Sequence, residues 1–497
     1  MLLVAAAYLA IRLVGITADP PPVPNGVSSV ELLVEPVAKA HEARNWALFG
    51  EFQTNPVDNY QFWRPQSPVW VYSLAGWFRL MGVSYLQLRL FSVLVSLAGF
   101  FVFLAYAERR LQKVPLLGAG LFFGFNVFQI FYTRVGLLEP AVNTLIIVTA
   151  YLLLRAEKRP AWLAGALVAW AAAFLTKQTA LFFLPVVLMV GVWLYVRALT
   201  RGGASRLDKW LPPLAFVAVF GGLAFYCSRP EYLRTAAWNL GHVVLGKAQH
   251  KTLSTEVIPW WEVLARPFTA ERWTRRYFWL FPVAAVLSSV AVLGITKRLL
   301  QRRASLWEAI VWLWWGSSLG AVLLTTPEGN RFELIVYPSV ALLAGEGLSI
   351  LSAPIARRRW PRLAMVLSLA VCAGAGTYDG VHYVRGVSKR KYTVEKVNTD
   401  VEKAIGKGPA VVIGLWAGPS VFNTPYTYYY VKDNFNATRE SLVALKVTHF
   451  LLFDKMDYTR GILTRHYPHM MRTIKKRKTF TILRSKISLY KPDKALK

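Results

Sequence analysis

The sequence has little cysteine and lacks the patterns that would mark a zinc site or a nucleotide cofactor. Two cysteines occur among 497 residues. Cys227 and Cys372 both fall at or inside apolar runs, where a small buried side chain is expected rather than a disulfide. No cysteines and histidines have zinc-ligand spacing, and the segment 414–418 lacks a dinucleotide-binding fingerprint. We expect no cofactor; a divalent metal is left open, although no clustered ligand set indicates one.

Acidic residues are also scarce: 27 of them stand against 58 lysines and arginines, a formal net charge of +31. Such a surplus raises the question of a nucleic-acid partner, but no nucleic-acid-binding motif accompanies it. Apolar residues are abundant instead. The chain is 55% hydrophobic and 17% charged, with a mean hydropathy of +0.36. These values predict an integral membrane protein, with the lipid bilayer as its surroundings.

Apolar runs long enough to cross roughly 30 Å of hydrocarbon recur from the first residues to about Val384. The first run is not followed by a good signal-peptide cleavage site and no basic region precedes it, so we treat it as a span. Eleven spans are predicted, at about 2–17, 85–106, 114–133, 139–154, 161–176, 180–196, 211–227, 277–296, 306–325, 333–352 and 363–384.

Lysine and arginine are distributed as the positive-inside rule requires for a cytoplasmic N-terminus. All five predicted inside loops are then basic, at 109–113, 155–159, 197–209, 297–303 and 357–362, whereas the first outside loop is acidic. We therefore expect a multi-pass protein of the plasma (inner) membrane. The first outer loop (residues 18–84), a second long loop (228–276) and the chain after about residue 385 are predicted to lie outside.

Glu139 lies at the outer end of the fourth predicted span, within the segment TRVGLLEPAV. By itself it is typical of a helix start, since a carboxylate is favourable there and Pro140 is tolerated in the first turn. The first outer loop favours a functional site. Residues 31–50 predict an amphipathic interfacial helix ended by Gly50, and an aromatic-rich stretch follows. Two interfacial helices in one loop indicate a site where lipid headgroups meet water.

Several short motifs, in this order and on one side of the membrane, resemble the C-type glycosyltransferases (GT-C). Within this family the chain resembles the aminoarabinose transferases and protein O-mannosyltransferases. The resemblance covers about residues 1–350. It is carried by the acidic first-loop helix with its Phe49-Gly50 end, the Ser67-Pro68 aromatic stretch, Gly82-Val83, Arg89, Leu138-Glu139-Pro140, Thr176-Lys177-Gln178 and the segment PEGNRF (327–332).

The resemblance implies an inverting enzyme that moves a sugar from a polyprenyl phosphate to an acceptor. Because the departing phosphate is stable as an anion, one base suffices. The implied base is Glu35, although Glu35-Pro36 stands where the family usually has Asp-Glu. Glu139 is the second acidic group, which positions the acceptor or holds the surroundings of Glu35. The sequence leaves open which of the two takes the proton.

Binding of the donor phosphate requires cations at the same membrane level. The candidates, each in an outer loop or at a span end, are Lys177, Arg331, Arg64 and Arg134. The alternative for each is a side chain that extends from a helix end toward water. Arg134 has a further alternative, an ion pair with Glu139.

The predicted fold class is an α-helical multispanning membrane protein, GT-C-like, plus a small C-terminal α/β extracytoplasmic domain. About eleven transmembrane helices belong to a transmembrane domain of residues 1–390, with interfacial helices in the first outer loop. In the soluble domain, residues 391–497, we predict helices at 396–408 and 437–446, strands at 409–416 and 447–454, and a hairpin at 479–492. The loop 228–276 predicts further interfacial helices.

Two other functions stay open. A transporter or flippase of lipid-linked sugars would place ionisable residues near mid-membrane on broken helices and show repeated halves, and neither pattern is evident in the sequence. A non-catalytic membrane scaffold is compatible with Glu35-Pro36. The sugar, the carrier length, the oligomeric state and the acceptor, whether lipid, protein or cell-envelope glycan, are not defined by the sequence.

Overall fold

A computed structural model of the chain describes ten continuous segments and a few isolated residues. The segments are 2–20, 31–58, 63–201, 205–230, 281–324, 330–357, 360–431, 436–453, 458–483 and 485–492; the isolated positions are 232, 233, 265, 269, 273, 277 and 278. Most of the loop 228–276 and the motif residues 327–329 lie outside this set. The chain divides into two compact units.

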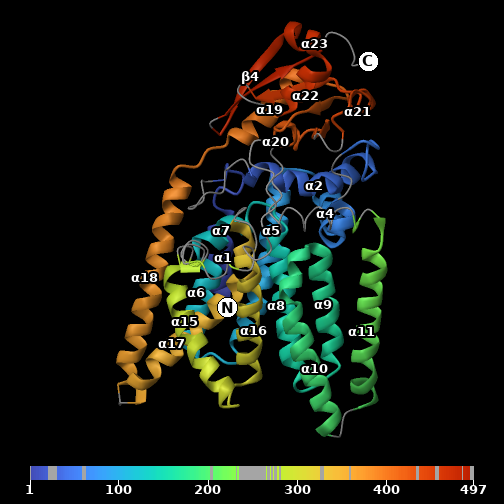
Figure 1. Cartoon of the computed structure of the whole chain (residues 1–497). Helices are drawn as coiled ribbons and strands as arrows, with labels where there is room; N and C mark the ends of the chain where they lie inside the picture. The colour runs from blue at the N-terminus through green and yellow to red at the C-terminus, as the bar shows by residue number, and fades with distance from the viewer. Residues whose placement is uncertain are drawn as a thin grey trace. The chain divides into compact units, whose positions relative to one another are not determined.

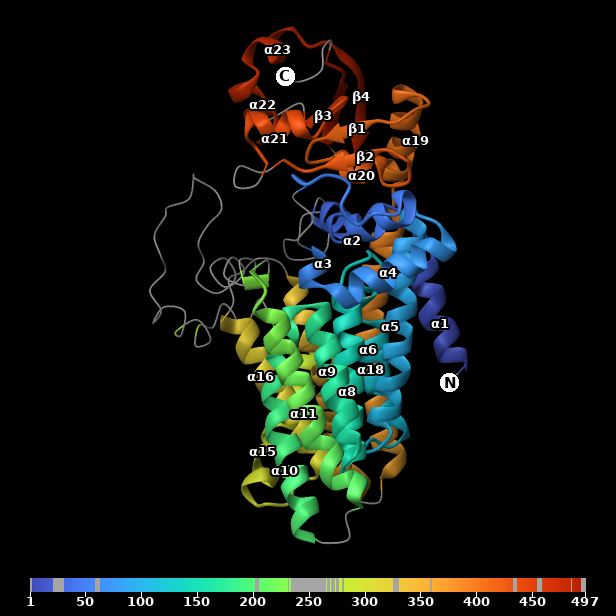
Figure 2. The same cartoon turned by 90° about the vertical axis from the view of Figure 1, so that its right-hand side faces the viewer.

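The first, which we call the helical unit, comprises Met1–Ile11, Leu94–Thr133 and Glu139–Val384. Its long helices run roughly parallel to one another (Figures 1 and 2). In chain order the helices that lie wholly or partly in it are α1 (Leu2–Leu13), α5 (Tyr85–Ala107), α6 (Lys113–Phe125), α7 (Val127–Thr133), α8 (Glu139–Ala156), α9 (Trp162–Thr176), η1 (Gln178–Phe183), α10 (Leu184–Arg201), α11 (Arg206–Cys227), α15 (Pro282–Leu300), α16 (Leu306–Leu324), η5 (Asn330–Ile335), α17 (Tyr337–Arg357) and α18 (Pro361–Ser388).

The prediction of a multispanning helical protein is confirmed. Among the described residues, eight helices are long and apolar enough to cross a membrane, or nine if the bent pair α6 and α7 counts as one span. The two other predicted spans are shorter apolar helices, α1 and α9. Helix α1 ends early because the chain turns at Gly15, which has φ +60°, and α9 ends where Lys177 adopts an extended backbone.

The bend in the third predicted span lies at Asn126, between α6 and α7, whose axes differ by 49°. Asn126 leaves the helical conformation, and its side-chain oxygen accepts the N–H of Phe128 at 3.0 Å. Asp379 of α18 accepts both the N–H of Val127 and the side-chain amide of Asn126, each at 3.0 Å. Backbone groups freed inside a membrane protein must find such partners. The sequence did not indicate this break.

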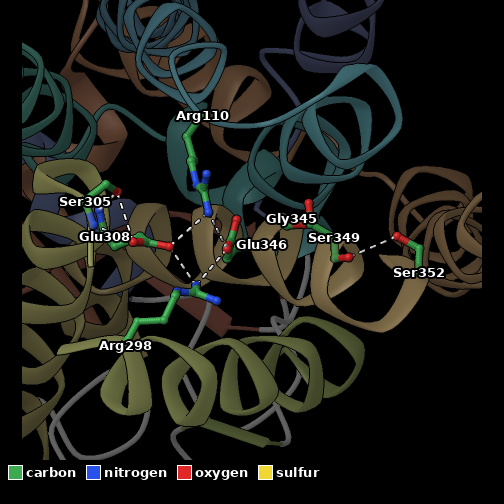
Figure 3. A network of polar contacts seen from close by, with 8 residues as sticks. All are labelled: Arg110, Arg298, Ser305, Glu308, Gly345, Glu346, Ser349 and Ser352. Carbon is green, nitrogen blue, oxygen red and sulfur yellow. Dashed lines mark hydrogen bonds and ion pairs between the residues drawn. The ribbon is translucent and has the colours of Figure 1, made fainter. Parts of the chain in front are cut away.

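Four charged side chains join α15, α16, α17 and the end of α5 in a closed network (Figure 3). Arg110 contacts Glu308 at 3.0 Å and Glu346 at 3.4 Å. Arg298 contacts the same two carboxylates at 2.7 and 2.9 Å. Glu308 and Glu346 are 1% and 3% exposed. Two positive and two negative charges therefore neutralise one another inside the helical unit.

The second compact unit, which we call the loop-and-sheet unit, comprises Arg12–Val93, Arg134–Leu138 and Arg385–Lys497. It contains the three helices of the first predicted outer loop, α2 (Glu31–Phe49), α3 (Trp63–Gln66) and α4 (Pro68–Met81). Helix α2 ends at Gly50, as predicted, with φ +80°. Its expected exposed polar face is absent, because Lys39, Glu42 and Arg44 are buried together with the apolar residues.

The burial of α2 has a cause far along the chain. Arg44 donates hydrogen bonds to four backbone carbonyls, those of Val421, Phe422, Thr424 and Tyr426, at 2.5 to 3.3 Å. Burial lowers the pKa of Arg44 to about 10, which leaves it charged at neutral pH. First-loop residues and C-terminal residues therefore form one core, and the domain boundary at residue 390 stays a prediction.

The C-terminal part is a five-stranded mixed sheet with strand order β2-β1-β3-β5-β4. The strands β1, β2 and β3 are parallel, and β5 is antiparallel to β3 and β4. Figure 2 shows α19 on one side of the strands and α21 and α22 on the other. The bounds are α19 (Thr393–Ile405), β1 (Val411–Ile413), α20 (Ala417–Val421), β2 (Thr427–Tyr429), α21 (Arg439–Ala444), β3 (His449–Phe453), α22 (Tyr458–His466), α23 (Pro468–Thr473), β4 (Lys476–Ile482) and β5 (Ser485–Tyr490).

The predicted C-terminal α/β elements are therefore confirmed: both predicted helices, both strands and the terminal hairpin are present. The sequence missed β2, which is only three residues long. A strand this short has no readable alternation.

Candidate functional site

In the helical unit the structure brings together Glu139 and Lys177, two of the predicted site residues. Glu139 is the first residue of α8, and Lys177 lies between α9 and η1. The Lys177 Nζ contacts the Glu139 carboxylate directly, and the two side chains are 18% and 7% exposed. Glu139 does start a helix, as its position in the sequence indicates. Its carboxylate also pairs with Lys177.

The surroundings of this pair fix α8 against η5. Asn143, one turn after Glu139, donates to the carbonyl of Leu334 at 2.7 Å. The backbone of Arg331 belongs to η5, which also carries the buried acid Glu333. The side chain of Arg331 lies outside the described residues. Its predicted role in phosphate binding stays a prediction, although its backbone belongs to the 3-10 helix that Asn143 holds.

Glu35 and Arg64 lie in the loop-and-sheet unit. Glu35 is on α2, with its side chain 20% exposed and 3.7 Å from Lys39, one helical turn away. The Arg64 guanidinium lies over the ring of Phe52, with 5.1 Å to the ring centroid. Within the part of the chain that the structure describes, no carboxylate lies within 4 Å of that guanidinium. The Arg64 guanidinium is therefore a cation whose charge is not neutralised by a close acid.

Arg134 has a structural role that the sequence did not suggest. It is 8% exposed, and its Nη2 donates to the carbonyls of Val14, at 2.9 Å, and Gly15. Arg89 donates to the next carbonyls, those of Ile16 and Ala18, both at 2.7 Å. The two arginines thus hold the chain where it leaves α1. Arg134 remains the least suited of the four cations to a phosphate, because part of its guanidinium is already used.

The sequence missed Glu42 as a site candidate, although it lies two turns after Glu35 on the same face of α2. Glu42 is 1% exposed, and it accepts the backbone N–H of Arg64. Burial raises the pKa of Glu42 from near 4.5 to about 8, opposed by the hydrogen bond and the charge of Arg64 and assisted by Asp58. The seven-residue spacing from Glu35 could have identified Glu42 as a candidate, because it puts both acids on one face of the helix. The burial of Glu42 could not be predicted from the sequence.

A histidine and an aspartate adjoin Glu42. His41 Nε2 lies 2.5 Å from Asp58 Oδ2, and both side chains are fully buried. Asn45 Nδ2 lies 3.1 Å from the same histidine nitrogen. Among the described residues, no group of three or more histidine, cysteine, aspartate or glutamate side chains could hold a metal ion.

No protein-family model matches the sequence, and no curated protein matches it. Solved structures do match its fold. The crystal structure of ArnT from Cupriavidus metallidurans bound to undecaprenyl phosphate aligns with a TM-score of 0.59 and 11% identity, covering 98% of this chain and 97% of that chain. The apo form of the same protein gives 0.60 and 12% over the same shares.

A third match is the crystal structure of the Archaeoglobus fulgidus oligosaccharyltransferase in complex with zinc and sulfate. Its TM-score is 0.56 at 11% identity, covering 94% of this chain and 69% of that chain. The shared architecture is that of the multispanning GT-C glycosyltransferases. The chain has the GT-C fold, and the predicted resemblance is confirmed at the level of the fold.

Proposed function

We propose that the protein is an inverting glycosyltransferase that moves a sugar from a polyprenyl-phosphate donor to an acceptor at the outer face of the membrane. The observation that supports this best is the buried Glu139–Lys177 pair at the predicted outer ends of α8 and α9, in a chain with the GT-C fold. One structural neighbour is described as bound to undecaprenyl phosphate, which agrees with a lipid phosphate as the carrier.

On the donor side, Lys177 is the principal phosphate-binding group, assisted by Arg331, Arg64 and Arg134. A lysine has three N–H donors, so Lys177 can contact Glu139 and a phosphate oxygen together. Positive charge there stabilises the negative charge that develops on the phosphate as the sugar leaves. Glu139 holds Lys177 in place before the donor binds.

On the acceptor side, Glu35 is the base that takes the proton from the attacking nucleophile. The side chain of Glu35 on α2 is 20% exposed. A single displacement with one base inverts the sugar configuration, and the phosphate departs without a general acid. The acceptor is a lipid, a protein or a cell-envelope glycan.

Sugar transfer in reconstituted vesicles tests the proposal. Wild type, Glu35→Gln and Glu139→Gln receive labelled polyprenyl-phosphate sugars and an envelope extract as the acceptor pool. We expect transfer by wild type and a loss of about 100-fold or more in Glu35→Gln. Glu51→Gln, the same change at an exposed position just after α2, is the matched control and keeps the wild-type rate.

Two results would redirect the assignment. Full transfer by Glu35→Gln would remove Glu35 as the base while leaving the enzyme intact. No transfer by wild type with any donor would favour a non-catalytic scaffold or a transporter of lipid-linked sugars. A transporter would then have to move the donor across the vesicle membrane.

A further inference from the structure

Glu42 is an acid that the proposed reaction does not use, although it is deeply buried, at 1% exposed. Its Oε2 accepts the Arg64 N–H. Its Oε1 is buried and has no hydrogen-bond partner among the residues that the structure describes. An ionised carboxylate with a free buried oxygen costs several kcal/mol. A neutral carboxyl avoids that cost, but its O–H then requires an acceptor.

The charges around Glu42 agree with a neutral carboxyl. Arg64 on α3 opposes protonation, and Asp58, in the segment before α3, favours it. His41, the neighbour of Glu42 on α2, is engaged with Asp58. Burial outweighs the effect of Arg64, and the resulting pKa of Glu42, about 8, keeps the group protonated at pH 7.

Among the described elements, α20 and α4 also pack on α2. Helix α20 consists of AGPSV and carries no titratable side chain. Helix α4 carries Tyr72, which is 54% exposed, and Arg79, which donates to the carbonyl of Ala47 at 3.5 Å. The protonation state of Glu42 is therefore governed by Arg64, Asp58 and burial.

Arg64 supplies the positive charge of a candidate anion site, and the Glu42 carboxyl supplies its hydrogen-bond donor. Its backbone holds Glu42, while its guanidinium rests on Phe52 without a close carboxylate among the described residues. The charge of Arg64 acts on Glu42, and a cation together with a neutral O–H donor attracts a phosphate. An ionised carboxylate in the same place would repel one, so the neutral state of Glu42 is what makes the site usable.

We propose that Glu42 is a neutral carboxylic acid at the α2–α3 junction whose Oε1 donates a hydrogen bond to a phosphate oxygen of the lipid-linked donor. This inference rests on the proposed function. When the bond from the sugar to the phosphate oxygen breaks, the electron pair stays on that oxygen, and the phosphate changes from a diester to a monoester with more negative charge. A donor aimed at it is strengthened in the transition state. Glu42 keeps its proton, and the proton of the acceptor goes to Glu35.

Glu42→Gln tests this assignment without removing the contact to Arg64. The amide oxygen still accepts the Arg64 N–H, and the amide N–H₂ replaces the O–H as a neutral donor, but the side chain no longer ionises. We expect the wild-type transfer rate to fall about tenfold between pH 7 and pH 9, because Glu42 ionises with a pKa of about 8. Glu42→Gln should stay within a few-fold of wild type at pH 7 and lose this decline. Glu51→Gln should keep the wild-type profile.

A binding measurement gives a readout independent of turnover. The probe is undecaprenyl phosphate added to the purified full-length protein in detergent. Between pH 7 and pH 9 the Kd of wild type should rise about tenfold relative to that of Glu42→Gln, since both variants face the same ionisation of the ligand.

The outcomes separate this inference from the proposed function. An unchanged alkaline decline in Glu42→Gln would leave Glu42 only as the acceptor of the Arg64 N–H. A hundredfold loss at pH 7 in folded Glu42→Gln would show that the ionised form is needed. Either result would rule out Glu42 as a neutral hydrogen-bond donor. Sugar transfer by wild type would still support the proposed glycosyltransferase activity. If wild type binds the lipid phosphate with the expected pH dependence but transfers no sugar, the anion site stands and the proposed function does not.

Discussion

The helical unit contains two ionic clusters with buried acids, and the clusters differ in how their charges are satisfied. In the network of Arg110, Arg298, Glu308 and Glu346, each cation contacts both acids and each acid contacts both cations. The Glu139–Lys177 pair joins one lysine to one glutamate. A closed network resists the entry of a further anion, because each arginine would have to give up its contacts with the two glutamates. A lysine with three donors accepts an additional anion at a smaller cost.

The two clusters also come from opposite sets of loops. Arg110 and Arg298 belong to predicted inside loops, whereas Glu139 and Lys177 lie at predicted outer span ends. We infer that the network stabilises the bundle and that the pair serves the reaction. Neutralising each cluster in turn should therefore affect different measurements.

The largest expected effect is on catalysis, from the double variant Glu139→Gln with Lys177→Met. Removing both members avoids leaving either charge of this pair buried without the other, so we expect the protein to fold. Without its cation for the leaving phosphate, sugar transfer should fall by about 100-fold or more. The measurement is initial rate in vesicles, beside the melting temperature in detergent. A double variant that transfers sugar at a wild-type rate would reduce the pair to a structural contact.

The network should respond in the opposite way. Glu308→Gln leaves two arginines facing one glutamate, and we expect a loss of about 3 kcal/mol in stability, the low end for a broken buried pair because Arg110 is 42% exposed. The fraction that survives folding should transfer sugar at the wild-type rate per molecule.

Glu157→Gln is the matched control for the network. Glu157 pairs with Arg197 at 3.5 Å and is 43% exposed, so the same change should alter stability by about 0–1 kcal/mol. Equal melting temperatures for Glu308→Gln and Glu157→Gln would contradict a stabilising role of the network.

The membrane explains why so much of the helical unit was predictable. Crossing a membrane requires long apolar helices, so hydropathy alone located all eleven helical segments. Glu139 was recognisable because it begins such a segment, on the side predicted to be outside. Lys177 was recognisable as a candidate cation, but its contact with Glu139 was not, because the two residues are 38 positions apart and only the antiparallel packing of α8 on α9 brings their side chains together.

The first outer loop was less predictable, because its environment is built by residues that are distant in sequence. The carbonyls that hold Arg44 come from positions about 380 residues later. No local pattern on α2 could show that Lys39, Glu42 and Arg44 would be buried. The bend at Asn126 has the same origin, since Asp379, which completes it, lies 253 residues away.

A third ionic contact, Glu35–Lys39 on α2, completes the comparison and should give the smallest effect. The pair has i,i+4 spacing and a separation of 3.7 Å, a geometry that stabilises a helix by about 0.2–0.5 kcal/mol. Lys39→Met should therefore shift the melting temperature very little. Lys39→Met leaves the Glu35 carboxylate in place, so the transfer rate should change by less than about threefold. A loss as large as that of Glu35→Gln would mean that Lys39 itself contacts the substrate, and the catalytic unit of α2 would then be the ion pair rather than the single carboxylate.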